Sequence, residues 1–269
     1  MSEFRPIVLA MDGCKSAMDL VVKTTCIMNN PDVGKFVGLV KINDGNFKPD
    51  MSAPMISQAL QVVAEVTRVN FGIFNDLKLG DVSTTMANYA RCFKDHSPEI
   101  MTVSTIIEPK GFLEVRRELP NTKIALFSVP TDMTSEQCQR KYWLTPEERI
   151  LQDIIFFLEE WEKLAQDHDI PTETPFDLVV CSPRELDYLK IGVGDKLGFV
   201  CPGIRDSWMN NDHQRRTTGV YEALSKGANW LVMGSQLLKG NPEAGVSAEE
   251  SQKRTLEEIQ RFMADNKIS

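Results

Sequence analysis

The sequence has few histidines, no closely paired cysteines and no long apolar run, and each absence argues against one class of protein. It contains only three histidines (His96, His168 and His213), none at metal-ligand spacing from another, so no zinc site is expected. Six scattered cysteines form no CxxC pair, which predicts reduced thiols and a cytosolic protein. No apolar run approaches the ~18 residues of a membrane span. The opening residues, MSEFRPIVLAMDG, also lack the pattern of a secretory signal.

Positive charge is also in short supply. Lysine and arginine total 30 against 38 aspartates and glutamates, giving a formal net charge of -8. Nucleic-acid grooves need clustered cations, so this balance argues against a nucleic-acid partner. A small anionic substrate remains compatible with the composition, because a few local cations can bind one inside an acidic protein.

Eight short apolar runs rich in β-branched residues predict buried parallel strands. Amphipathic stretches lie between them, and the one at 147–169 repeats apolar residues at helical spacing, including Ile150, Ile154, Ile155 and Trp161. The sequence therefore predicts an α/β fold, a single (β/α)8 TIM barrel over residues 1–269. The competing open sheet usually has a GxGxxG turn after its first strand, and MDGCKS stands there instead. The predicted strands are 6–11, 36–42, 71–77, 100–104, 123–129, 177–182, 197–203 and 229–234.

Two connections are long for a barrel, and long connections at its C-terminal face are often functional. Residues 131–147 are expected to form a polar loop after the fifth strand. Residues 202–216 are expected to form a second polar loop, with Trp208 and Met209 as an apolar tip.

Charged residues gather where the first three strands are expected to end. Asp12 ends the first strand, Lys41 lies near the end of the second, and Asp76 and Lys78 end the third. Asp76 and Lys78 are two apart and so share one face of an extended chain. Asp81 would return to them if the chain turned at Gly80. A solvated loop with surface ion pairs would explain DLKLGD alone, but charges in a barrel mouth are costly unless they are paired or used.

Such an alternating chain of cations and carboxylates can support a decarboxylation without a metal or organic cofactor. A carboxylate beside a substrate carboxylate repels it, and loss of CO2 relieves that repulsion. A lysine held between carboxylates stays protonated. It can therefore stabilise the developing carbanion and deliver a proton to it.

The ordered motifs resemble the orotidine 5'-monophosphate decarboxylase family, especially its bacterial members, over nearly the whole chain. The DxKxxD signature lies in FNDLKLGDVSTT (74–85), and the other segments follow in the family's order. They are VLAMD (8–12), LVKINDGNF (39–47), FDLVVCSPREL (176–186), FVCPGIRD (199–206), HQRRTT (213–218) and GANWLVMGSQLLKGNP (227–242).

The resemblance implies catalytic roles for Lys41, Asp76, Lys78 and Asp81. Asp76 would face the substrate carboxylate, and Lys78 would protonate C6 of the pyrimidine. Asp12, helped by Lys41, would hold the ribose hydroxyls. Asp81 would complete the site of a partner subunit, which implies a homodimer with shared active sites.

The remaining implied contacts concern the base, the ribose and the phosphate. Thr131 matches the position that hydrogen-bonds the pyrimidine, and Thr85 would contact the ribose region across the dimer interface. The phosphate contacts depart from the family. Gly234-Ser235 stands where the family has Gly-Arg, and an ungapped alignment puts Ser207 at the place of a phosphate-binding glutamine.

Backbone N–H groups at Gly234-Ser235 could bind the phosphate instead, and Arg205, Lys239, Arg215 or Arg216 could supply the cation. Segment 202–216 would close over it. The resemblance thus implies a cofactor-independent decarboxylase that forms UMP in pyrimidine synthesis. Two alternatives stay open: a decarboxylase or lyase of the same superfamily acting on a different substrate, and a catalytically silent ligand-binding homologue.

Overall fold

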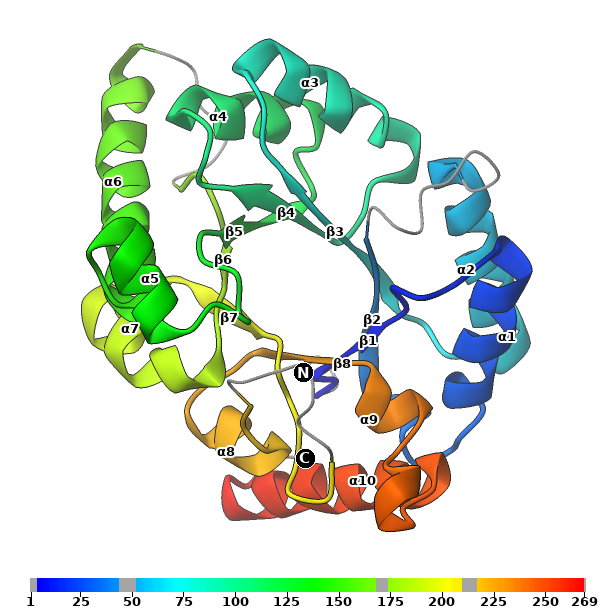
Figure 1. Cartoon of the computed structure of the whole chain (residues 1–269). Coiled ribbons are helices and arrows are strands. Elements are labelled where there is room, and N and C mark those ends of the chain that lie inside the picture. Colours follow the sequence, from blue (N-terminus) through cyan, green and yellow to red (C-terminus); the bar gives the residue numbers. More distant parts are fainter. Residues whose placement is uncertain (1–3, 44–51, 168–173, 210–216, 269) are drawn as a thin grey trace.

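The chain folds into a closed barrel of eight parallel strands surrounded by helices, as the sequence predicts (Figure 1). The structure is a computed structural model that describes residues 4–43, 52–167, 174–209 and 217–268. Each strand pairs with the next along the chain, and the last pairs with the first. The strands are β1 (Ile7–Ala10), β2 (Val37–Asn43), β3 (Gly72–Leu79), β4 (Ile100–Ser104), β5 (Lys123–Phe127), β6 (Leu178–Val180), β7 (Gly198–Cys201) and β8 (Trp230–Met233).

The helices form a ring outside the strands. The α-helices are α1 (Ala17–Met28), α2 (Ala53–Thr67), α3 (Ser83–Arg91), α4 (Pro109–Glu118), α5 (Ser135–Tyr142), α6 (Pro146–Asp167), α7 (Leu186–Val193), α8 (Val220–Ser225), α9 (Ser235–Leu238) and α10 (Ala248–Asp265). Short 3-10 turns are η1 (Gly34–Phe36), η3 (Lys94–His96), η4 (Pro183–Glu185), η5 (Gly194–Lys196) and η6 (Pro242–Ala244).

Strand side chains alternate between two apolar cores. The smaller core fills the barrel interior and includes Val8, Leu39, Phe74, Ile100 and Val200. The larger core lies between the strands and the helix ring. Because each strand alternates, the residues two positions beyond an inner apolar residue also point inward. The charged residues at the strand ends therefore project into the barrel mouth.

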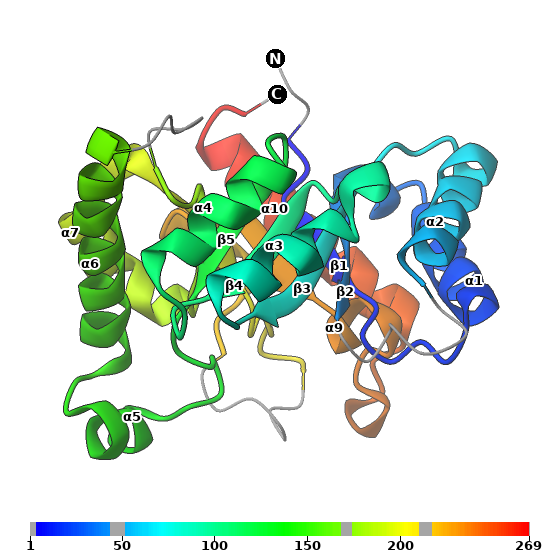
Figure 2. The same cartoon turned by 90° about the horizontal axis from the view of Figure 1, so that it is seen from above.

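The connection 131–147 is not the irregular loop that its polar composition suggested. It contains α5, whose first turn is closed by a capping box. The Thr134 side chain accepts a hydrogen bond from the Gln137 N–H, and the Gln137 side chain accepts one from the Thr134 N–H. These reciprocal bonds stabilise a helix start in a polar segment. Figure 2 shows α5 at one end of the barrel, with both chain termini at the other.

The expected apolar tip of the second long connection is instead packed against the molecule. The Trp208 Nε1–H donates to Ser251 Oγ on α10 (3.0 Å), and Met209 is 7% exposed. Residues 210–216, the rest of the expected lid with Arg215 and Arg216, lie outside the described residues.

The expected spacing of α6 is confirmed on one face of the helix. Ile150, Ile154 and Trp161 are buried, whereas Ile155 is 45% exposed and lies off that face. Phe157 is buried and packs edge-on against Phe112 of α4, with ring centroids 4.8 Å apart.

We expect Phe157→Ala to lower the free energy of unfolding by about 3–5 kcal/mol, because it leaves a cavity between α4 and α6. Phe156 is the matched control, since it is the neighbouring residue on the same helix and is 48% exposed. Urea titration of both variants measures the difference. Equal losses from the two substitutions would contradict this packing.

Candidate active site

A cavity of about 300 Å³ opens at the C-terminal ends of the strands. The lining residues lie on or just after every strand except β4, and they combine apolar side chains on the barrel floor with charged groups at the rim. They are Ala10, Asp12, Lys41, Phe74, Asp76, Lys78, Phe127, Thr131, Val180, Val200, Pro202, Gly203, Ile204, Arg205, Val232, Gly234, Ser235 and Gln236. A concave site with a few convergent polar groups is where a barrel binds small ligands.

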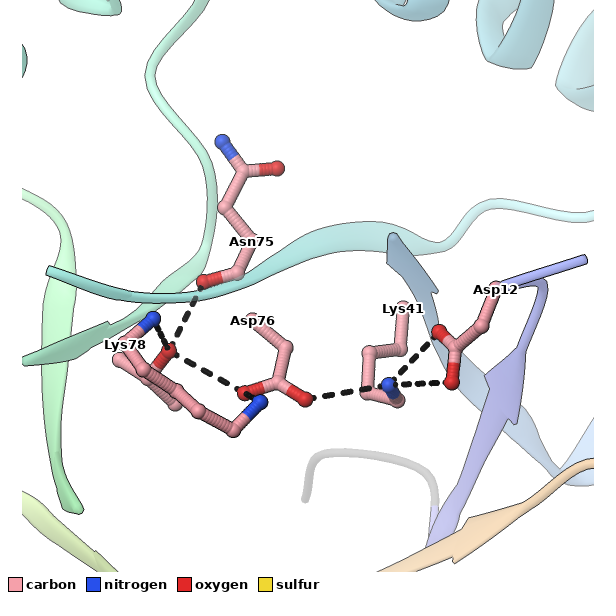
Figure 3. A network of polar contacts seen from close by, with 6 residues as sticks. Asp12, Lys41, Asn75, Asp76 and Lys78 are labelled. Carbon is pink, nitrogen blue, oxygen red and sulfur yellow. Dashed lines mark hydrogen bonds and ion pairs between the residues drawn. The ribbon is translucent and has the colours of Figure 1, made fainter. Parts of the chain in front are cut away.

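Four charged side chains form a continuous chain across one wall of this cavity (Figure 3). Lys41 Nζ lies 2.7 Å from Asp12 Oδ1 and 3.1 Å from Asp76 Oδ2. Lys78 Nζ lies 2.9 Å from the other Asp76 oxygen, Oδ1. The charges therefore alternate from Asp12 through Lys41 and Asp76 to Lys78. Each neighbour stabilises the ionised form of the next.

The strand register brings these residues together. Ala10 of β1 lies opposite Lys41 of β2, so Asp12 follows directly beyond the lysine. Asn43 at the end of β2 lies opposite Asp76 of β3. Asp12, Lys41 and Asp76 all have the parity of the inner core, which points their side chains into the barrel mouth.

Lys78 reaches the same wall through an unusual backbone. Its φ is 49°, in the left-handed region, and the pairing of β3 with β4 shifts register between Asn75 and Leu79. The turn was expected at Gly80, but that glycine has no positive φ. Gly80 instead approaches the neighbouring loop closely: a Cβ there would lie 2.7 Å from the Ile106 side chain, which would have to shift.

Lys41 and Asp76 are buried, so each can stay charged only because it is paired with groups of opposite charge. Burial by itself would lower the pKa of Lys41, but the charges of Asp76 and Asp12 outweigh it and raise the pKa above 10.5. Burial by itself would raise the pKa of Asp76, but Lys41 and Lys78 outweigh it and lower the pKa below 3.8. Both groups therefore stay ionised across the physiological range.

The structure places the other residues singled out from the sequence in two groups. Thr131, Arg205, Gly234 and Ser235 line the cavity with the four charged residues. Asp81, Thr85 and Ser207 do not line it.

Asp81 belongs to a separate surface depression, where it lies beside Val82 and Ile106. Its Oδ1 accepts the Val82 N–H at 2.7 Å. Within one chain, the alternating network thus ends at Lys78.

Three groups at the site escaped the sequence reasoning. Thr102 of β4 lies behind Asp76 and Lys78, with its hydroxyl 3.2 Å from Asp76 Oδ1. Lys78 Nζ also lies 5.2 Å from the centroid of the Phe127 ring, within cation–π range. Thr102 and Phe127 are ordinary strand residues, and only the register of β4 and β5 places them here.

The third missed group is a buried contact between the segments that follow β7 and β8. Asp206 Oδ2 accepts a hydrogen bond from Gln236 Nε2 (2.6 Å), and Asp206 N–H donates to Gln236 Oε1 (3.0 Å). Burial raises the pKa of Asp206 against the effect of the bonds that it accepts from Gln236 and Val220 N–H. The pair fixes Arg205 and Ser235, which adjoin it in sequence, on one side of the cavity.

Among the described residues, no cluster of His, Cys, Asp and Glu has the arrangement to hold a metal ion. None of the six cysteines forms a disulfide, and Cys181 and Cys201 are buried as expected for core residues. No helix in the described part of the chain is long and apolar enough to cross a membrane.

Asp76→Asn tests whether this network stabilises the fold through its charges. The lowered pKa means that ionised Asp76 contributes stability above its unfolded value of 3.8, and this contribution is lost as pH falls through the lowered value. We expect a loss of about 3 kcal/mol in unfolding free energy at neutral pH, shrinking toward about pH 3, in urea titrations. Asp95→Asn on the surface is the control. A loss that is the same at both pH values would contradict the assignment.

The chain is similar in sequence to known proteins. The Orotidine 5'-phosphate decarboxylase / HUMPS family matches residues 36–249. The orotidine 5'-phosphate decarboxylase of Nitrosospira multiformis is 28% identical over 185 residues, covering 68% of this chain and 72% of the relative. That of Syntrophomonas wolfei is 25% identical over 248 residues, covering 88% and 92%.

Solved structures agree on the fold. The crystal structure of orotidine 5'-phosphate decarboxylase from Lactobacillus acidophilus superposes with a TM-score of 0.66 at 17% identity, covering 95% of this chain and 99% of the other. The family match spans most of the chain and includes Lys41, Asp76, Lys78 and Asp81. The chain therefore belongs to the orotidine 5'-phosphate decarboxylase / HUMPS family.

Proposed function

We propose that the protein decarboxylates orotidine 5'-monophosphate to uridine 5'-monophosphate, as the names of its relatives indicate. One observation carries the proposal: Lys78 Nζ lies 2.9 Å from Asp76 Oδ1 at the mouth of a nucleotide-sized cavity. This pair provides the fixed negative charge and the proton that the reaction requires. The product is a pyrimidine nucleotide, so the enzyme would serve pyrimidine synthesis, in the cytoplasm.

The reaction follows from the charge order. The substrate carboxylate lies beside Asp76, and its repulsion from that carboxylate is relieved when the bond from C6 to the carboxyl carbon breaks. CO2 leaves, and the electron pair stays on C6. The Lys78 ammonium stabilises this carbanion and transfers a proton to C6, and the neutral amine then regains a proton from water. Lys41 keeps Asp76 ionised throughout.

The rest of the nucleotide extends across the cavity. The Asp12 side chain is 42% exposed, and its carboxylate accepts hydrogen bonds from the ribose hydroxyls. Lys41 holds this carboxylate in its orientation. Thr131 hydrogen-bonds the pyrimidine. The phosphate lies at the Gly234-Ser235 turn, and Arg205 supplies its cation. Barrels commonly bind phosphate between the segments that follow strands seven and eight, which Asp206 and Gln236 hold together here. Ser207 is exposed and does not line the cavity, so no phosphate contact is assigned to it.

The site is completed by a second copy of the chain. Asp81 and Thr85 do not line the cavity of their own chain. Asp81 lies beside Val82 and Ile106, whose relative exposures are 66% and 81%. Large apolar side chains at that level of exposure are suited to burial in an interface. In the proposed homodimer, Asp81 extends the partner's charge chain beyond Lys78, and Thr85 approaches the ribose.

Lys78→Ala should reduce decarboxylation of orotidine 5'-monophosphate by at least ~10⁴-fold, because it removes both the proton donor and the charge facing the carbanion. The loss of orotidine absorbance, followed at neutral pH with chelator present, measures it. Lys163→Ala on the exposed face of α6 is the control and should match the wild type. A wild type that folds but does not turn over the substrate would contradict the proposal.

The replacement of arginine by Ser235 favours one second candidate, a decarboxylase for a non-phosphorylated substrate. The same assay with orotidine separates the two. Faster turnover of the nucleoside than of the nucleotide would support the second candidate, because remote phosphate binding would then contribute nothing to the transition state.

Mixing two inactive variants tests the shared site. Lys78→Ala and Asp81→Ala should each be inactive as homodimers. In a heterodimer, the site built on the Asp81→Ala chain has its own Lys78 and receives Asp81 from the partner. If subunits exchange at random, about half of the dimers are hybrids, and one of the two sites in each hybrid is intact. Activity should therefore return to about a quarter of the wild-type value. Hybrid dimers without any recovery would show that Asp81 acts within its own chain or not at all.

A further inference from the structure

Thr102 has a fully buried hydroxyl that contacts both members of the Asp76–Lys78 pair. Its side chain is 0% exposed. The hydroxyl accepts the Lys78 backbone N–H at 2.7 Å and lies 3.2 Å from Asp76 Oδ1. An ionised carboxylate can only accept, so the hydroxyl donates to Asp76 while accepting from Lys78. The alternative acceptor, the Asn75 carbonyl, lies 3.5 Å away, at the limit of a hydrogen bond.

These two bonds occur where β3 leaves the regular ladder. The register between β3 and β4 shifts between Asn75 and Leu79, so Lys78 has no regular place in that ladder. Its φ of 49° is a conformation that a residue with a long side chain seldom adopts. The Thr102 hydroxyl provides the acceptor that the Lys78 N–H needs in this conformation.

The same hydroxyl also orients the Asp76 carboxylate. Oδ2 of Asp76 is held by Lys41 Nζ, and Oδ1 is shared between Lys78 Nζ and Thr102 Oγ1. Without Thr102, the Lys78 ammonium alone would hold Oδ1. The Lys78 side chain is 40% exposed and flexible, so it would be a weak anchor.

We infer that Thr102 is a positioning residue, which sets the distance and angle between the Lys78 ammonium and the Asp76 carboxylate through the backbone of Lys78. It touches neither substrate nor reacting atoms, because it does not line the cavity. Its kinetic consequence rests on the proposed decarboxylation, whereas its structural consequence does not.

Thr102→Val removes the hydroxyl and keeps the shape of the side chain. We expect kcat to fall by about 10–100-fold, because a small misplacement of a reacting group has a cost of that order, while KM changes by less than about 3-fold. Thr102→Ser, which restores the hydroxyl, should recover kcat to within about 3-fold of the wild type.

Thr24→Val is the matched control. Thr24 lies on α1, is also 0% exposed, and its hydroxyl has no hydrogen-bond partner among the residues that the structure describes. It should keep the wild-type kcat. An equal fall in both valine variants, or a Thr102→Val enzyme with wild-type kcat, would overturn the inference. So would a Thr102→Ser enzyme as slow as Thr102→Val.

Crystal structures of the wild type and of Thr102→Val test the positioning role of Thr102 without any measurement of activity. We expect Lys78 to leave the left-handed region in the variant and its Nζ to move beyond ion-pair distance of Asp76 Oδ1. An unchanged Lys78 backbone and ion pair would overturn the inference even if activity fell. If the wild type did not decarboxylate the nucleotide, the proposed function would fail, and these structures would still decide the role of Thr102.

Discussion

The buried ammonium of Lys41 is the constraint on which the rest of the site depends. Its side chain is 7% exposed, and it stays charged because Asp12 and Asp76 lie on either side of it within hydrogen-bonding distance. Removing either carboxylate would leave a buried cation only half compensated. The lysine therefore requires two anions at fixed places, and these are the two carboxylates on which the proposed function depends.

This arrangement also explains why Asp76 can remain ionised beside a second carboxylate. An isolated buried carboxylate facing a substrate carboxylate would gain a proton instead of repelling its neighbour. Lys41 on one side and Lys78 on the other hold the pKa of Asp76 below its usual value. In the proposed reaction the repulsion would thus act on the substrate, because the charges within the protein are already paired.

The sequence was sufficient for the parts of the molecule that depend on local pattern. Short apolar runs at regular intervals predicted all eight strands, and the positions of Asp12, Lys41 and Asp76 at strand ends predicted a charged cluster at the barrel mouth. The helix at 135–142 could also have been found, because Thr134 and Gln137 have the spacing of a capping box. Its polar composition concealed it.

The errors and omissions have a common cause, since they involve contacts between segments distant in sequence. Gly80 looked like the turning point, but the register between β3 and β4 placed the left-handed residue at Lys78. Trp208 looked like a lid tip until α10, some forty residues later, supplied its hydrogen-bond partner. Nothing in the sequence around Thr102 or Gln236 indicates that these residues lie at the site. The proposed role of Asp81 depends on a second chain, whose position cannot be predicted from the pattern of one chain.

The most direct test is a crystal structure of the wild-type protein with uridine 5'-monophosphate bound. The account predicts C6 within about 3.5 Å of Lys78 Nζ, the distance of a near-attack arrangement. It also predicts ribose hydroxyls on Asp12 and the phosphate between Arg205 and the Gly234-Ser235 turn. A nucleotide bound with its base away from Lys78, or outside the cavity, would contradict the account.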